Sequence, residues 1–510
     1  GRSRAVLENE ALPQYLVKRR WYAAKQYGPP AVRIETASRM PEPADAQPGH
    51  VLVLAEVTAI TAGDRSRYLI PVGFVGEDDP VAGLQQQLAL ARVRRGKEVG
   101  FITDAFALDR FALQMVALMH SRARVPALDG EIRFDPTPAL AEAPLPAAPE
   151  IRRISADQSN SSVVIGDTIV LKVIRKVAGG LHPEAEMGRF LTLNGFANTP
   201  AMLGEVSRQG DDGQHYTLML MQRFLHNQGD GWQWTLSTLE RAAQHGSSLP
   251  VLDASGTVTP MNEFEAFVGT LGRRLGEMHS VLARSGSDAA FAPEAADAAM
   301  LARWCKQAIA QLDAAFKVLQ DAHEFSAEAA AQAEALLGQR KALRDAVKRL
   351  AAGAGGALAI RIHGDFHLGQ VLVSSGDAWI VDFEGEPSKP MEQRRAKASP
   401  WRDVAGLLRS FDYAAAFSVR GKEGAVAPDE RLLGEYHAIS SQAFLRAYRE
   451  YAPAGAEVGD EALLKLFMLE KAAYELCYEA ANRPAWLEVP LQGLARLAEA
   501  LLAGSPTEAA

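Results

Sequence analysis

Two aspartates, each beside a short apolar run, could carry the chemistry of this chain. Asp365 lies in Ile362-His363-Gly364-Asp365-Phe366-His367-Leu368-Gly369-Gln370, and Asp382 follows the run Ile380-Val381. In phosphoryl transfer, one Asp orients and deprotonates the acceptor hydroxyl, while an amide side chain and a second Asp hold Mg²⁺ on the phosphates of ATP. The pattern therefore predicts Asp365 as the base and Gln370 and Asp382 as Mg²⁺ ligands, since oxygen ligands suit this cation. The alternative for Asp365 is an ordinary turn-capping role.

Three further residues are expected to support this loop. His363 is expected to brace it through hydrogen bonds, whereas His367 is expected to face the substrate. Asp403, in Arg402-Asp403-Val404-Ala405, is expected to brace the loop from the N-terminus of a helix.

Lys172 is the expected partner of the α and β phosphates, and it needs an acid on the next helix to hold it. Its flanks, Val170-Leu171 and Val173-Ile174, indicate a strand buried on both faces, where an unpaired lysine would be costly. The alternative is a solvated strand lysine. We choose Glu186 as the partner, because Glu184 lies half a turn away and should point elsewhere.

The nucleotide would also contact two segments around this strand. The stretch Asp157-Gln158-Ser159-Asn160-Ser161-Ser162 has no glycine, but Ser159, Asn160 and Ser161 and the backbone amides could donate to phosphates. The same composition also describes an ordinary hairpin, and both possibilities stay open. Met221-Gln222-Arg223-Phe224 is the expected hinge that binds adenine, with Gln222 and Phe224 as its contacts.

The pattern of elements predicts an N-terminal domain followed by two lobes. Residues 136–149 are proline-rich and predict a semi-rigid linker after a small α+β cap domain, residues 1–135. Strands and one helix over 150–225 are typical of the small lobe of a kinase, and helices dominate the large lobe, 226–510. Residues 262–284 predict its central helix, because apolar residues recur at three- and four-residue spacing. A helix over 326–352 is expected to begin at the N-cap Ser326.

Composition excludes several classes of function. The chain has 510 residues and a net charge of −8, so no basic footprint for nucleic acid is expected. No apolar run is long enough to span a membrane, and no secretion signal is visible. The two cysteines form no ligand or disulfide framework, which suits the cytoplasm. A first residue other than Met indicates a processed chain, a tag remnant or a piece of a longer polypeptide.

Several longer segments resemble those of maltokinases. They are the loop His363-Gly-Asp-Phe-His-Leu-Gly-Gln370, the segment Asp382-Phe-Glu-Gly-Glu-Pro387, Asn227-Gln-Gly-Asp-Gly-Trp232, and Glu470-Lys-Ala-Ala-Tyr-Glu-Leu-Cys-Tyr-Glu479 with Asn482-Arg-Pro484. Arg20-Trp21-Tyr22-Ala23-Ala24-Lys25 is similar to the opening of the family's cap, with mild departures at Tyr22 and Ala24.

This resemblance covers essentially the whole chain and implies a fold and an activity. The fold would be α+β, bilobal and eukaryotic-protein-kinase-like, of the aminoglycoside phosphotransferase type, with an N-terminal α+β cap. The activity would be transfer of the γ-phosphate of ATP to the anomeric 1-hydroxyl of maltose. The product, maltose 1-phosphate, feeds α-glucan synthesis, and many relatives are fused to or associated with trehalose synthase, which is thereby implied as a partner.

The resemblance also assigns a sugar site. Lys471, Tyr474 and Tyr478 share one face of a helix, where aromatic rings can stack on a sugar and polar groups can bind its oxygens. Periodicity alone would instead indicate an amphipathic helix with tyrosines in the core. Glu384 is expected to touch the sugar or brace the metal loop.

Two rival functions stay open on the sequence. One is a related kinase for glucosamine or an aminoglycoside, whose site should carry extra acids in place of Lys471. The other is a nucleotide-binding pseudokinase that regulates a partner such as trehalose synthase, against which the intact set of Asp365, Gln370, Asp382 and Lys172 argues.

Overall fold

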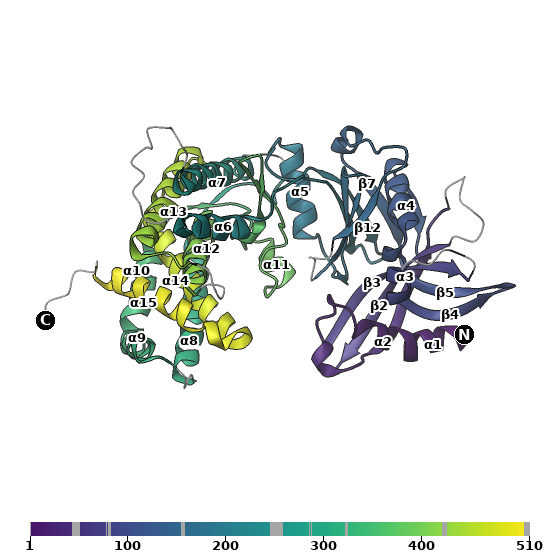
Figure 1. The fold of residues 1–510 in the computed structure, drawn as a ribbon, viewed down its shortest axis with the longest axis horizontal. Coiled ribbons are helices and arrows are strands. Elements are labelled where there is room, and N and C mark those ends of the chain that lie inside the picture. Colours follow the sequence, from purple (N-terminus) through teal and green to yellow (C-terminus); the bar gives the residue numbers. More distant parts are fainter. Residues whose placement is uncertain are drawn as a thin grey trace. The chain divides into compact units, whose positions relative to one another are not determined.

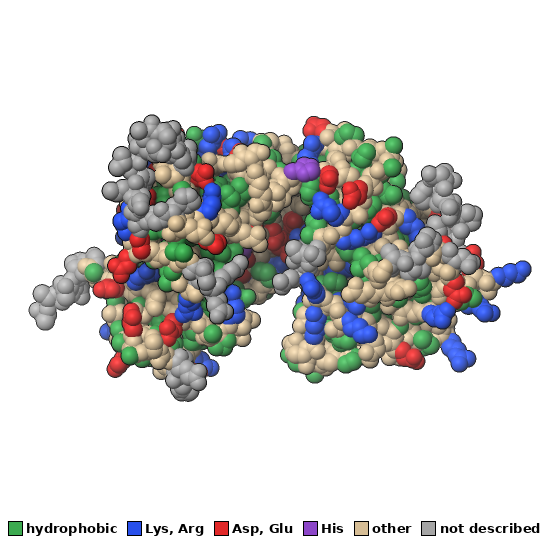
Figure 2. All heavy atoms as spheres, viewed as in Figure 1, with side chains coloured by type: hydrophobic (Ala, Val, Ile, Leu, Met, Phe, Trp, Pro, Cys, Tyr) green, Lys and Arg blue, Asp and Glu red, His purple; other side chains and the backbone are tan. Residues whose placement is uncertain are grey.

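The structure is a computed structural model, and it describes residues 2–42, 51–77, 79, 83–154, 159–244, 259–284, 286, 288–321, 325–420 and 426–503. The chain forms two compact units, Gly1–His226 and Asn227–Ala510 (Figure 1). On the face seen in Figure 2, acidic and basic side chains are interspersed over both units. None of the described helices is both long and apolar enough to cross a membrane.

The first unit begins with an antiparallel sheet. Its strand order is β1 (Ala31–Arg39), β2 (Leu52–Thr61), β3 (Asp64–Gly76), β5 (Glu98–Asp104) and β4 (Ala89–Arg95), and β11 (Lys176–Val177) also pairs with β3. Leu12, Tyr15 and Leu16 of α2 (Leu12–Leu16) pack with Val57, Tyr68 and Ile70 of the sheet. The short helices α1 (Arg2–Val6), η1 (Leu7–Ala11), η2 (Lys25–Tyr27) and α3 (Gly83–Gln87) complete this part.

A second sheet of seven strands follows in the same unit. Its order is β6 (Arg124–Pro126), β7 (Glu131–Pro136), β12 (Met202–Gln209), β13 (His215–Arg223), β10 (Ile169–Val173), β9 (Ser161–Ile165) and β8 (Ile151–Ile154). Helix α4 (Asp109–His120), preceded by η3 (Ala105–Ala107), packs on one face of this sheet, and α5 (Pro183–Leu193) packs on the other through Ala185, Met202 and Leu220. Strands β9 and β10 form a hairpin, and Gly166 and Asp167 in its turn both have positive φ.

The proline-rich stretch 136–149 differs from a linker that separates two domains. The strands on either side of it, β7 and β8, belong to the second sheet, and its own residues form η4 (Pro138–Glu142). Leu140 and Ala143 are buried in the core of that sheet. The prolines prevent regular structure, but the apolar residues between them still pack. The cap and small-lobe strands therefore share one compact unit.

The second unit is mainly helical. Its helices are α6 (Gly231–Gln244), α7 (Pro260–Leu282), α8 (Ala298–Asp321), α9 (Ala327–Gly338), α10 (Arg340–Ala352), α11 (Met391–Arg394), α12 (Trp401–Arg420), α13 (Glu430–Tyr451), α14 (Asp460–Asn482), η6 (Pro484–Trp486) and α15 (Glu488–Ala503). The expected central helix is α7, and a Cβ at its Gly272 would lie 2.5 Å from the Phe444 carbonyl oxygen of α13. Ser326 caps α9 as expected, but the expected helix 326–352 is divided at Gln339 into α9 and α10.

Two small antiparallel strand pairs interrupt these helices, and the second of them is a hairpin. Strand β14 (Glu294–Ala295) pairs with β15 (Leu358–Ala359), and β16 (Val371–Ser374) pairs with β17 (Asp377–Ile380). The turn η5 (Leu368–Gln370) leads into β16. The loop that contains Asp365 and the loop that begins at Asp382 therefore flank the second hairpin.

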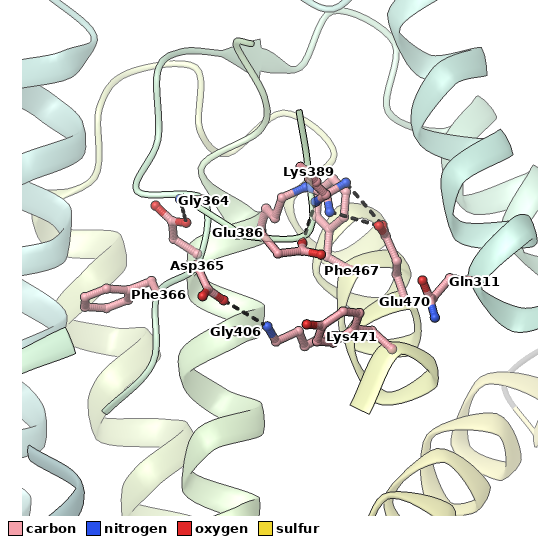
Figure 3. Close-up of a pocket in the computed structure, with 13 residues that line it drawn as sticks. Gln311, Gly364, Asp365, Phe366, Glu386, Lys389, Gly406, Phe467, Glu470 and Lys471 are labelled. Carbon is pink, nitrogen blue, oxygen red and sulfur yellow. Dashed lines mark hydrogen bonds and ion pairs between the residues drawn. The ribbon is translucent and has the colours of Figure 1, made fainter. Parts of the chain in front are cut away.

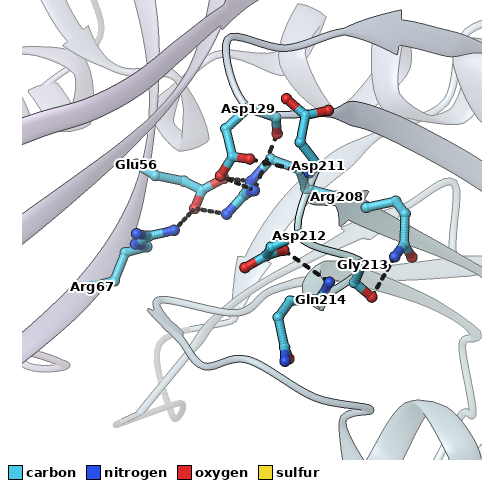
Figure 4. A network of polar contacts seen from close by, with 9 residues as sticks. Glu56, Arg67, Asp129, Arg208, Asp211, Asp212, Gly213 and Gln214 are labelled. Carbon is cyan, nitrogen blue, oxygen red and sulfur yellow. Dashed lines mark hydrogen bonds and ion pairs between the residues drawn. The ribbon is translucent and has the colours of Figure 1, made fainter.

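A buried ion-pair network joins the two sheets of the first unit (Figure 4). Arg208 on β12 is fully buried, and its Nε and Nη2 atoms donate to the Glu56 carboxylate of β2 at 2.6 and 3.1 Å. Its Nη1 atom donates to Asp129, between β6 and β7, at 2.9 Å. Arg67 on β3 approaches Glu56 from the other side, at 3.4 Å. The charge of Glu56 is thus matched by cations from both sheets.

We expect Glu56→Ala to destabilise this unit by about 3–5 kcal/mol, because it leaves a buried arginine without its main partner. Urea unfolding followed by tryptophan fluorescence measures the change. The matched control is Glu77→Ala, which breaks an exposed pair with Arg92 and should cost about 1 kcal/mol or less. Equal effects of the two substitutions would contradict a structural role of the buried pair.

Candidate functional site

The loop around Asp365 is fixed through its backbone. Gly364 has φ +84°, a conformation that favours glycine, and this turn points the amides of His363 and Gly364 at one buried carboxylate. That carboxylate is Asp403, in the first turn of α12, which accepts from His363 N at 2.8 Å and Gly364 N at 2.9 Å. The expected bracing role of Asp403 is therefore confirmed.

Two histidines complete this brace. His279 of α7 contacts Asp403 Oδ2 through Nε2 at 3.1 Å and the Tyr448 hydroxyl through Nδ1 at 3.0 Å. His363 Nε2 donates to the carbonyl oxygen of Val381 at 2.9 Å and so ties the first loop to the second, as the sequence predicted. Burial opposes the charge of Asp403, but the hydrogen bond and the charge of His279 outweigh burial and lower the pKa of Asp403.

The Asp365 carboxylate faces a lysine. Lys471 Nζ on α14 lies 3.3 Å from Asp365 Oδ1, and both side chains are largely buried. Burial alone would raise the pKa of Asp365, but the positive charge of Lys471 outweighs it, helped by His367 and His363, and the pKa is lowered. Asp365 is therefore ionised at neutral pH and able to accept a hydrogen bond or a proton.

Gln370 and Asp382 lie side by side after the two loops. Gln370 Nε2 donates to Asp382 Oδ2 at 3.2 Å, and the backbone links Val381 N to Gln370 O at 3.0 Å. Asp382 has φ +66°, an uncommon conformation for a residue other than glycine, and such conformations are found at functional sites. An amide and a carboxylate that converge in this way offer the oxygen donors that Mg²⁺ prefers. The two residues fit the expected metal site.

A pocket opens beside Asp365 (Figure 3). Its enclosed volume is about 60 Å³, and the space between its walls and across its open mouth is about 510 Å³. The lining comes from five parts of the second unit: α8, the catalytic loop, the segment after β17, α12 and α14. The residues are Gln311, Gly364, Asp365, Phe366, Glu386, Lys389, Arg402, Asp403, Gly406, Phe467, Glu470, Lys471 and Tyr474.

Acids and cations that line the pocket are paired with one another. Arg402 makes a bidentate pair with Glu470 at 2.9 and 3.1 Å, and Lys389 Nζ lies 2.7 Å from Glu386 Oε2. With the Lys471–Asp365 pair, three cations match three of the four acids in the lining, and the fourth acid, Asp403, is buried and accepts from the His363 and Gly364 amides. An aromatic ring lies beside one of these pairs, because Lys471 Nζ is 4.9 Å from the centroid of the Tyr474 ring. The pocket combines matched charges with aromatic faces.

The other residues predicted for the substrate lie outside this lining. Tyr478 stacks on Tyr474 with ring centroids 6.3 Å apart and is 45% exposed. His367 Nδ1 accepts from the Gly369 amide at 3.0 Å, so this nitrogen stabilises its own turn. Burial lowers the pKa of His367, although the charge of Asp365 opposes this effect. Glu384 follows the metal loop and does not line the pocket.

In the first unit, Lys172 is paired as expected but with a different acid. Lys172 Nζ lies 2.7 Å from Glu184 Oε2, and Gln222 Nε2 donates to the other Glu184 oxygen at 3.3 Å. Glu184 is buried, whereas Glu186 is partly exposed. The choice of Glu186 was wrong, because α5 packs through Ala185 and Met187 and this orientation points Glu184 toward β10.

Some residues of the segments expected to bind the nucleotide make hydrogen bonds to other residues of the first unit. Residues 155–158 lie outside the described residues. Asn160 Oδ1 accepts from the Arg175 amide at 3.3 Å and Ser161 Oγ from Arg175 Nε at 2.8 Å, whereas Ser159 is exposed. Phe224 follows the end of β13, and its amide donates to the Thr168 carbonyl at 2.8 Å. Their contacts with a nucleotide stay predictions.

Several pocket residues were missed by sequence reasoning. Glu386 and Glu470 lie in segments that resemble those of maltokinases, and Arg402 directly precedes Asp403. The sequence could therefore have indicated these three residues as part of the site. Gln311 and Phe467 gave none, because only the packing of α8 and α14 brings them to the pocket.

Comparisons with known proteins show the family to which the chain belongs. Residues 150–448 match the family described as "Phosphotransferase enzyme family", and residues 15–107 match the "Maltokinase N-terminal cap domain". The chain is 28% identical over 342 residues to a glucosamine kinase of Mycolicibacterium smegmatis, covering 66% of this chain and 77% of that protein. It is 26% identical over 447 residues to a glucosamine kinase of Streptacidiphilus jiangxiensis, covering 85% and 86%.

Solved structures show the same fold over nearly the whole chain. A glucosamine kinase in crystal form B has a TM-score of 0.66 at 23% identity, covering 97% of this chain and 99% of that one. A glucosamine kinase in complex with glucosamine, ADP and inorganic phosphate has a TM-score of 0.63 at 22% identity, covering 97% and 98%.

We expect Asp403→Asn to lower stability at pH 7 by about 1–3 kcal/mol, because one buried partner of the carboxylate is left unsatisfied. The pKa of the Asp403 carboxyl is lower in the folded protein than in the unfolded chain, so the ionised carboxyl stabilises the fold at pH values above the unfolded pKa of about 4. This contribution is lost as the pH falls below that pKa. The gap between wild type and variant should therefore narrow on acidification. Urea unfolding at pH 7 and at about pH 3, below the unfolded pKa, measures it, with the exposed Asp345→Asn as control, and a constant gap would argue against a charge-dependent brace.

Proposed function

Because the chain belongs to the phosphotransferase enzyme family, we propose that it transfers the γ-phosphoryl group of ATP to the 1-hydroxyl of maltose. Its fold is the expected bilobal kinase-like one with an N-terminal cap domain. The proposal is carried by one observation: the ionised Asp365 carboxylate lines an open pocket, beside Lys471 and the Tyr474 ring.

Each step of the proposed transfer has a residue. Asp365 accepts the hydrogen of the sugar hydroxyl and removes its proton as the oxygen attacks phosphorus. Lys172, held by Glu184, binds phosphate oxygens of ATP. Gln370 and Asp382 would hold Mg²⁺, which neutralises charge on the phosphates when bound. Tyr474 and Tyr478 offer ring faces to the sugar.

The pairing of charges in the pocket supports a neutral sugar. An ammonium group on the substrate needs a carboxylate whose charge is not already matched, and Asp365, Glu386 and Glu470 each have a cation. The match to the maltokinase cap domain, together with the motifs near Asp365 and Tyr474, supports maltose among neutral sugars.

Glucosamine is the second candidate. The observation that favours it is that the two relatives with 26% and 28% identity are named glucosamine kinases. Both candidates use the same transfer chemistry, so they differ only in how the pocket recognises the acceptor.

We expect ADP release to be fastest with maltose when maltose, glucose, glucosamine and kanamycin are compared in a coupled assay. Asp365→Ala should lower kcat by about 10²–10⁴-fold, the usual contribution of a positioned base. The exposed Asp345→Ala is the control for an aspartate far from the loop. Faster turnover of glucosamine would replace the first candidate with the second, and full activity of Asp365→Ala would remove the assignment of the base.

We expect Glu184→Gln to lower kcat/KM for ATP by about tenfold or more, equivalent to roughly 1.4 kcal/mol, because Lys172 loses the charge that positions it. Glu186→Gln is the matched control on the same helix and should stay near wild type. Steady-state kinetics with varied ATP at saturating sugar provide the measurement. A larger loss in Glu186→Gln would show that the functional partner of Lys172 differs from the one in the structure.

A further inference from the structure

Lys471 has a second carboxylate close to it, one helical turn along α14. Glu475 is 9% exposed, and its Oε2 atom accepts from Arg409 Nε at 3.0 Å and from Arg409 Nη2 at 2.6 Å. Residues four apart on a helix are neighbours, so Glu475 and Lys471 lie on one face of α14. The Glu475 carboxylate is thus bound to a buried arginine of α12 and lies on the same helix face as the cation that pairs with Asp365.

The side chain of Arg409 is enclosed by residues that restrict its movement. It is almost fully buried and donates through Nη1 to Asp412 at 2.8 Å. Helix α15 closes over it: a Cβ at Gly493 would lie 2.6 Å from Arg409 Nη2. The Arg402–Glu470 pair makes a second bidentate link between α12 and α14. Glu475 therefore occupies a fixed position relative to α12.

The groups that face Lys471 come from three elements. They are Asp365 of the catalytic loop, Glu386 of the segment after β17, and Glu475 with Tyr474 of α14. Burial lowers the pKa of Lys471, but the three carboxylates outweigh burial, so the pKa is raised. Burial raises the pKa of Glu475 above its ordinary value, and the charges of Arg409 and Lys471 oppose burial without outweighing it. Lys471 stays charged because acids surround it.

We propose that Glu475 is a positioning residue for the base: fixed by Arg409, it holds Lys471 charged and against Asp365 Oδ1, which leaves Oδ2 for the sugar hydroxyl. This proposal rests on the proposed function, in which Asp365 is the base. The hydroxyl proton passes to Asp365 while the sugar oxygen bonds to the γ-phosphorus, and the bond to the β–γ bridging oxygen breaks, so that ADP leaves with its electron pair.

The structure offers a matched pair of variants. Glu475→Gln and Asp412→Asn each remove one carboxylate charge from Arg409 while nearly keeping the shape, but only Glu475 also faces Lys471. Loss of folding would affect both variants, whereas loss of the support of Lys471 would affect only Glu475→Gln. Thermal unfolding is recorded for each, and Glu475→Asp tests rescue by a shorter carboxylate.

The first measurement is the pH profile of kcat with saturating maltose and ATP. In Glu475→Gln the loss of activity at alkaline pH should begin about one pH unit lower than in wild type, with kcat reduced about tenfold and KM for ATP unchanged. Asp412→Asn should keep the wild-type profile, and Glu475→Asp should recover part of it. Wild-type behaviour of Glu475→Gln, or the same shift in Asp412→Asn, would overturn the proposal.

The second measurement separates this proposal from the proposed function, because it needs no turnover. The rate at which acetic anhydride labels Lys471 in the unliganded protein is followed against pH by mass spectrometry. A lysine that loses its charge at lower pH is labelled at lower pH. We expect this shift in Glu475→Gln alone. If wild type turns over none of the sugars but the shift occurs, the proposed function fails while the role of Glu475 in charging Lys471 stands; no shift overturns that role.

Discussion

The buried carboxylate of Asp403 is the constraint on which the site depends. A charge with no solvent contact is tolerated only when hydrogen bonds surround it, and here the amides of His363 and Gly364 and the ring of His279 do so. Those amides can reach it only when Gly364 adopts a positive φ, so the conformation of the loop and the burial of the charge require each other. Asp365 is the next residue, and its position follows from this arrangement rather than from its own contacts.

Helix α12 transmits that constraint to the sugar side of the pocket. Asp403 lies in its first turn, Arg402 beside it pairs with Glu470, and Arg409 two turns later pairs with Glu475. One rigid helix therefore sets the loop that carries Asp365 and also the register of α14, which carries Lys471. The two charged groups are 106 residues apart in sequence, yet their separation of 3.3 Å is fixed by contacts to the same element. Rigid placement of this kind is what lets a base meet a hydroxyl in the correct geometry.

The sequence predicted what depends on local pattern and missed what depends on packing. The loops with Asp365, Gln370 and Asp382 lie beside short apolar strands and were visible in the local pattern, whereas the face of Lys471 and Tyr474 was implied by the resemblance to maltokinases and not by helical spacing alone. Glu184 was missed because the rotation of α5 is set by Met202 and Leu220, which come later in the chain. Gln311 reaches the pocket from α8, whose packing no local pattern encodes. Prolines over 136–149 correctly indicated irregular backbone, but they could not show that Leu140 and Ala143 are buried.

Whether this pocket would accept a neutral or an amino sugar depends on which of its three ion pairs the ammonium group of a substrate could break. Arg402 makes two bonds to Glu470 and packs over the Phe467 ring at 4.5 Å, so separating this pair would break both kinds of contact. The Asp365–Lys471 pair belongs to the base. Lys389 instead makes one contact of 2.7 Å with Glu386, and its side chain is 30% exposed, so it could move into water at little cost. Recognition of an amino sugar by this pocket would therefore require Glu386 to exchange Lys389 for the substrate, whereas a neutral sugar leaves all three pairs closed. Discrimination between the two candidates thus depends on Glu386 more than on any residue that the motifs alone identify.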